Sequence, residues 1–73
     1  MTKQEFLLKV PHVIQLRGWG IAKIEIAADN SQKKGVCYRH TKKQTATCGA
    51  YGTSWTEVHQ KLIRHLMEHG LYD

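Results

Sequence analysis

Residues 54–70 constrain the fold most, because they have the pattern of an amphipathic helix. Ser54 and Glu57 have the spacing of a capping box, and Gly70 stands where a C-terminal cap belongs. The apolar side chains of this segment gather on one broad arc: Trp55, Val58, Leu62, Ile63 and Leu66. A helix of this kind buries its apolar arc against another element of the protein. The rest of the chain therefore has to supply a packing surface.

Three segments that precede this helix predict an antiparallel sheet as the packing surface. Residues 21–28 alternate apolar and polar side chains, and residues 36–41 and 45–51 are rich in Thr, Tyr and Val. Residues 29–35 are rich in turn-forming types, and residues 42–44 form a short connection between the last two predicted strands. The pattern predicts three strands joined by two turns.

The N-terminal region has the pattern of a helix that a proline interrupts. Thr2 and Glu5 form a second capping-box match, and apolar residues recur at helical spacing over residues 6–14. Pro11 lacks a backbone N–H and clashes with the preceding turn, so we expect a break near residues 9–10 and a second short helical segment that starts at Pro11.

These elements predict one small α+β domain over residues 1–73, in the order α-β-β-β-α. Its three-stranded antiparallel sheet has the C-terminal helix packed on one face, beside the proline-interrupted N-terminal helix. The hydrophobic fraction of 41% and the charged fraction of 23% are typical of a folded chain. No run approaches the roughly 18 apolar residues of a membrane span, and the N-terminus has no signal-peptide pattern. We expect a cytoplasmic protein without a membrane partner, and the sequence specifies no oligomeric state.

A turn centred between Lys42 and Lys43 sets the predicted register of the last hairpin. It pairs three residues of one strand with three of the next: His40 with Thr45, Tyr38 with Thr47, and Cys37 with Cys48. In this register the two thiols lie with Ala46 and Ala50 beneath the C-terminal helix and act as small buried hydrophobes.

The opposite, uncovered face is the predicted contact surface. The chain has a formal net charge of +5, and no Asp or Glu occurs from Asn30 to Thr56. A local excess of positive charge attracts anionic partners. Tyr38 and His40 are expected to project from the uncovered face. Lys23, Glu25, Thr45 and Thr47 are expected beside them, and Tyr51 is left open as a further member. The predicted binding residues are Lys33, Lys34, Tyr38, Arg39, His40, Lys42 and Lys43.

Three functions fit this surface. The first is a non-enzymatic module that binds RNA or DNA, with the basic residues on phosphates and Tyr38 stacked on a base. The second is a small protein of the kind that phages and mobile elements encode, which binds an acidic surface of a host protein, such as a nucleic-acid-processing complex, and inhibits or modulates it. The third is a small nuclease in which His40 acts as a general base on a phosphodiester.

The sequence predicts no metal and no cofactor. Cys37 and Cys48 are separated by ten residues, without the C-x-x-C knuckles that hold zinc, and we expect both to be thiols in a reducing compartment. His65, Glu68 and His69 fit the H-x-x-E-H pattern of one metallopeptidase class, but the pattern lacks a third ligand and a cleft.

The predicted α-β-β-β-α order resembles that of double-stranded-RNA-binding domains over nearly the whole chain. The segment "YGTSWTEVHQK" (51–61) falls where that family has a glycine and a serine before its second helix. The family's phosphate-binding lysines at this helix start are replaced here by other residue types. Residues 17–26 ("RGWGIAKIEI") and 61–73 are similar to the first strand and closing helix of HicA toxins, whose catalytic histidine has no counterpart in this chain. The DNA-contacting arm-binding module of tyrosine recombinases has a similar sheet and helix. None of these similarities includes a signature motif.

Overall fold

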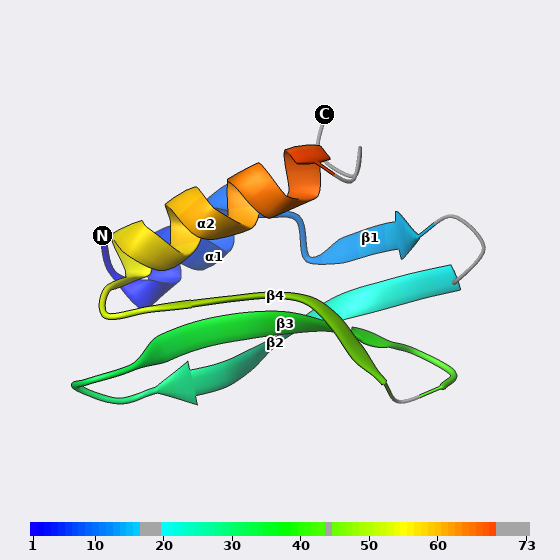
Figure 1. The fold of residues 1–73 in the computed structure, drawn as a ribbon, viewed down its shortest axis with the longest axis horizontal. Coiled ribbons are helices and arrows are strands. Elements are labelled where there is room, and N and C mark those ends of the chain that lie inside the picture. The colour runs from blue at the N-terminus through cyan, green and yellow to red at the C-terminus, as the bar shows by residue number, and fades with distance from the viewer. Residues whose placement is uncertain (17–19, 44, 69–73) are drawn as a thin grey trace.

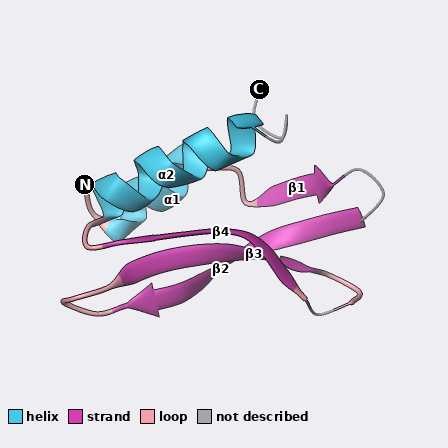
Figure 2. Cartoon of the chain, in the orientation of Figure 1, coloured by secondary structure: helices cyan, strands magenta, loops and turns pink. Residues whose placement is uncertain are grey.

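The computed structural model describes residues 1–16, 20–43 and 45–68 of the chain. Its elements follow one another as α1 (Lys3–Lys9), β1 (Val13–Leu16), β2 (Gly20–Asp29), β3 (Lys34–His40), β4 (Ala46–Gly52) and α2 (Trp55–Glu68). The four strands form one antiparallel sheet in the order β1-β2-β3-β4. Both helices lie on the same side of this curled sheet (Figure 1, Figure 2). The predicted α+β class is confirmed.

Both helices begin with the side-chain caps that the sequence predicts. The Thr2 hydroxyl accepts a hydrogen bond from the backbone N–H of Glu5 at 3.1 Å, and the Glu5 carboxylate accepts one from the Thr2 backbone. At α2 the Ser54 hydroxyl accepts from the backbone N–H of Glu57 at 3.2 Å. The Glu57 carboxylate reaches one residue further back than a capping box requires, to the backbone N–H of Thr53 at 2.7 Å. The predicted C-cap, Gly70, lies outside the described residues.

Residues 13–16 form a strand, so the predicted three-stranded sheet and the predicted second helical segment are wrong. The backbone is already extended at Val10, where α1 ends. β1 then pairs with β2 from Val13 opposite Lys23 to Leu16 opposite Gly20. Val13 and Ile14 are β-branched, which disfavours helix and favours an extended backbone. Their side chains alternate as in a half-buried strand, with Ile14 buried and Val13 exposed.

The core lies between the sheet and the two helices. α2 contributes the residues that its periodicity predicts: Trp55, Val58, Leu62 and Leu66. From α1, the Phe6 ring packs against Trp55 at a centroid distance of 5.1 Å and meets the edge of His59 at 6.4 Å. None of the described helices is long and apolar enough to cross a membrane.

The register of the last hairpin matches the prediction near its turn and departs from it further away. Tyr38 lies opposite Thr47, and the backbone N–H of His40 donates to the carbonyl oxygen of Thr45 at 2.8 Å. The register then shifts between Val36 and Tyr38, so that Val36 lies opposite Ala50. This irregularity falls at Cys37, so the predicted pairing of Cys37 with Cys48 stays a prediction.

The two faces of β3 are the reverse of those predicted. Val36 and Tyr38 are fully buried in the core, and the His40 side chain is only 4% exposed. Cys37 lies on the other side of the strand, away from the core cluster. The prediction that Tyr38 and His40 project from the uncovered face is therefore wrong. Burying the tyrosine ring removes far more apolar area from water than burying a thiol, and the Tyr38 hydroxyl donates to the carbonyl oxygen of Pro11 at 2.6 Å.

Candidate functional site

The outer face is the side of the sheet that points away from α1 and α2 (Figure 1). Its members follow from strand alternation, because residues next to the buried Ala22, Val36, Tyr38 and Ala50 point the other way. The side chains that the structure describes there come from all four strands: Val13, Gln15, Ile21, Lys23, Glu25, Cys37, Arg39 and Tyr51, with Gly35 opposite Tyr51.

Two cations lie directly opposite each other in the middle of the outer face. Lys23 of β2 pairs with Arg39 of β3 in the sheet register. The Arg39 Nε also donates to the Glu25 carboxylate at 2.6 Å, and both of these side chains are substantially exposed. Like charges opposite one another destabilise a sheet, and one carboxylate compensates only one of the two cations.

Among the side chains that the structure describes, Tyr51 is the aromatic one of the outer face, and it is absent from the predicted binding residues. It lies opposite Gly35, and its ring covers that glycine so closely that a Cβ there would overlap the ring. The Lys33 ammonium lies over the same ring, 4.8 Å from its centroid, and Tyr51 is 42% exposed. The sequence signal for this position is the alternation with Ala50, which was correctly predicted to lie beneath the helix. That alternation left Tyr51 open as a member of the uncovered face, but Tyr38 was preferred as the stacking residue.

The lysine pairs lie at the two ends of β3. Lys33 and Lys34 are at its start and Lys42 and Lys43 follow its end. A strand of 7 residues separates these ends by about 20 Å, at roughly 3.3 Å per residue. The Lys34 ammonium donates to the carbonyl oxygen of Asn30 at 2.9 Å. The predicted cations therefore do not form one patch, but lie along the length of the sheet.

His40 holds the turn between β3 and β4. Its Nδ1 accepts hydrogen bonds from the backbone N–H groups of Lys42 at 3.0 Å and Lys43 at 2.8 Å. A ring nitrogen that accepts two such bonds has its lone pair engaged, and the side chain is buried. This geometry suits a structural role in the turn and does not support a general base.

Cys37 is a free thiol beneath the exposed side chains of the outer face. Burial raises the pKa of this thiol, and the nearby Glu25 carboxylate raises it further, while Arg39 acts in the opposite direction. A thiol in this state is a weak nucleophile. Within residues 1–16, 20–43 and 45–68, no group of three or more His, Cys, Asp or Glu residues could hold a metal ion.

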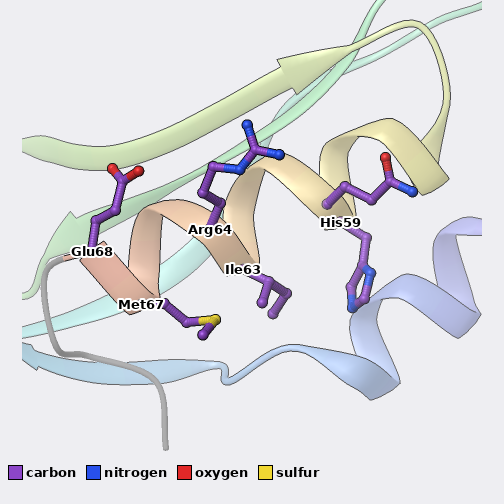
Figure 3. Close-up of a pocket in the computed structure, with 6 residues that line it drawn as sticks. His59, Ile63, Arg64, Met67 and Glu68 are labelled. Carbon is purple, nitrogen blue, oxygen red and sulfur yellow. The ribbon is translucent and has the colours of Figure 1, made fainter.

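A surface hollow lies along α2, away from the outer face. Its lining comes from this helix: His59, Gln60, Ile63, Arg64, Met67 and Glu68. His59, Ile63 and Met67 follow one side of the helix at intervals of four residues (Figure 3). Apolar, acidic and basic side chains are mixed in this lining, so its chemistry indicates no particular ligand.

No protein-family model, no curated protein and no solved structure matches this chain. The additional strand β1 also departs from the α-β-β-β-α order on which the resemblance to double-stranded-RNA-binding domains was based. The chemistry of the outer face is what remains to indicate function.

Proposed function

We propose that this protein is a non-enzymatic module that binds nucleic acid through the outer face of its sheet. The observation that supports this most is the direct pairing of Lys23 with Arg39 in the middle of that face. A phosphate group between the two cations would offset their repulsion and accept charge-assisted hydrogen bonds from both.

The distribution of acidic residues supports the same proposal. Glu5 and Glu57 bond backbone groups at the helix starts, and Asp29 pairs with Lys3 of α1 at 3.0 Å. Glu25 is the acidic side chain of the outer face among the described residues, and it is paired with Arg39. The outer face and its two basic turns therefore have a positive potential, which attracts a polyanion at long range.

The proposed phosphate contacts extend along β3. Five of the predicted binding residues keep this role: Lys33, Lys34, Arg39, Lys42 and Lys43. Lys23 joins them, and Tyr38 and His40 are withdrawn because both side chains are buried. A polyanion that lies along the strand reaches the lysine pairs at both ends, whereas a small anion reaches one.

The test compares two double variants that lose the same charge. Lys23→Gln with Arg39→Gln removes the central pair, and Lys9→Gln with Arg64→Gln removes two exposed cations of the helices. Affinity for a labelled oligonucleotide that spans the sheet is measured by fluorescence anisotropy over a salt series. The central double variant should bind more weakly, with a salt slope shallower by about 1.4 for a single strand or about 1.8 for a duplex.

The control double variant should keep nearly the slope of the unmodified protein. Equal losses in the two double variants would show that net charge alone drives binding and would contradict the proposed face. Absence of oligonucleotide binding, together with recovery of an acidic protein from nuclease-treated lysate, would contradict the proposal in favour of a protein partner.

A further inference from the structure

We infer that Tyr51 is a stacking site for an unpaired base, so that the ligand of the outer face is single-stranded nucleic acid. This inference rests on the proposed function and specifies the form of the nucleic acid. Aromatic side chains on open sheets bind bases through their π-faces, and such stacking tolerates any base.

The backbone beneath Tyr51 holds its ring against the sheet. A Cβ at Gly35 would overlap the ring carbon Cδ2 of Tyr51, and a Cβ at Gly49 would lie 3.6 Å from its Cε1. Glycine at position 35 lets the ring approach the main chain closely, whereas a Cβ at position 49 would make only an ordinary contact with the ring. The ring is therefore supported from below, while the residue as a whole stays 42% exposed.

The neighbourhood of the ring suits a nucleotide. In the sheet register, Ala28 lies opposite Gly35 and Gly35 lies opposite Tyr51, so the row beside the ring consists of small residues. The Lys33 ammonium already lies over the ring at 4.8 Å from its centroid. A base that stacks on the ring takes the place of this cation, and the displaced ammonium then lies beside the phosphates of the same strand.

A duplex does not fit this site. Its bases are stacked on one another, so their π-faces are closed to a side chain that lies on a sheet.

An alternative explanation is that the Tyr51 ring is structural, because an aromatic ring can stabilise a strand by covering a glycine. That role predicts a loss of stability when the ring is removed, but it predicts no preference for single strands, which separates the two explanations.

The first test measures affinity for oligothymidylate, oligouridylate and a duplex. Tyr51→Val should weaken binding of both single strands by roughly 5- to 150-fold, as expected for the loss of one base–aromatic stack. Tyr51→Phe keeps the ring and should bind within about twofold of the unmodified protein. Circular dichroism before each titration establishes that the variants are folded.

The second test needs no variant. Ring proton resonances of Tyr51 in the unmodified protein should move upfield when oligothymidylate is added, because a stacked base places them in its ring current. Ring resonances that stay in place at saturation would overturn the inference, as would a Tyr51→Val variant with unchanged single-strand affinity.

The Lys23→Gln, Arg39→Gln double variant separates the two proposals. If it weakens binding while Tyr51→Val does not, the stacking site is wrong and the proposed function stands. If neither weakens binding, both are wrong. If Tyr51→Val weakens single-strand and duplex binding equally, the ring acts without stacking and the inference is again overturned.

Discussion

Tyr38 shows how one residue can join three parts of this small fold. Its ring is fully buried among core side chains, while its hydroxyl donates to Pro11 in the connection between α1 and β1. A buried tyrosine stabilises a core when its polar end finds a partner of this kind. A tyrosine on the outer face could instead stack on a base. The residue type alone therefore does not distinguish a core tyrosine from a binding tyrosine.

Tyr38→Phe should lower the free energy of unfolding by about 1–2 kcal/mol, because the Pro11 carbonyl oxygen loses its donor inside the protein. Urea denaturation measures the loss. Tyr51→Phe is the matched control: it makes the same chemical change on an exposed ring and should cost less than about 0.5 kcal/mol. Equal costs for the two substitutions would contradict the assigned faces of the sheet.

His40 is the second residue whose role follows from its contacts. His40→Ala leaves the backbone N–H groups of Lys42 and Lys43 without their acceptor, and it should cost about 1–3 kcal/mol of stability. His40→Asn should keep a larger part of that stability, since an Asn side chain accepts from N–H groups two residues further along a turn. Thermal unfolding of the two variants gives the comparison. Identical effects of Ala and Asn would show that the ring does not act through these hydrogen bonds.

At the scale of elements, the pairing of β3 with β4 depends on the packing of the Tyr51 ring over Gly35. Gly35→Ala should cost about 1–3 kcal/mol, because its Cβ overlaps the Tyr51 ring and one of the two has to move. In a Tyr51→Ala background the same substitution should cost little, and a double-mutant cycle measured by chemical denaturation gives the coupling. Independent, additive costs would mean that the ring does not lie over Gly35.

The elements that the sequence predicts well are those whose signals are local. Capping residues and periodicity locate α1 and α2, and the turn residues of 29–35 locate the connection between β2 and β3. Strand β1 was missed because Val13 and Ile14 fit a helical spacing as well as an extended strand, and only the pairing with β2 distinguishes the two. Long-range pairing of this kind has no signature within the segment itself.

The faces of β3 were missed for a related reason. An irregularity in the pairing with β4 changes the alternation, so Ala50 lies on the core side together with Val36 and Tyr38 instead of with Cys37. A shift of one residue transfers a whole set of side chains to the other face of a sheet. The cationic residues of the candidate site were nevertheless predicted, because charge is visible in the sequence whichever face it occupies. Tyr51 was left open as a member of the uncovered face but was not chosen as a binding residue, because Tyr38 was expected to be the stacking residue there.

At the scale of the whole molecule, the two sides of the sheet have different tasks. The helices cover the inner side and bury the core there (Figure 2), whereas the outer face carries the exposed Lys23, Glu25 and Arg39. A chain of 73 residues has a small stability margin, so any repulsion between the opposed Lys23 and Arg39 is significant for its stability. A phosphate bound between the two side chains would offset that repulsion.

The most direct test of that central claim is a nuclear magnetic resonance titration of the isotopically labelled protein with oligothymidylate. If nucleic acid binds the outer face, backbone amide resonances of that face and of its basic turns should shift, with the largest changes near Lys23, Arg39 and Tyr51. Amides of α2 around Ile63 should stay in place. Shifts that concentrate on α2, or a spectrum that does not change at all, would contradict the account.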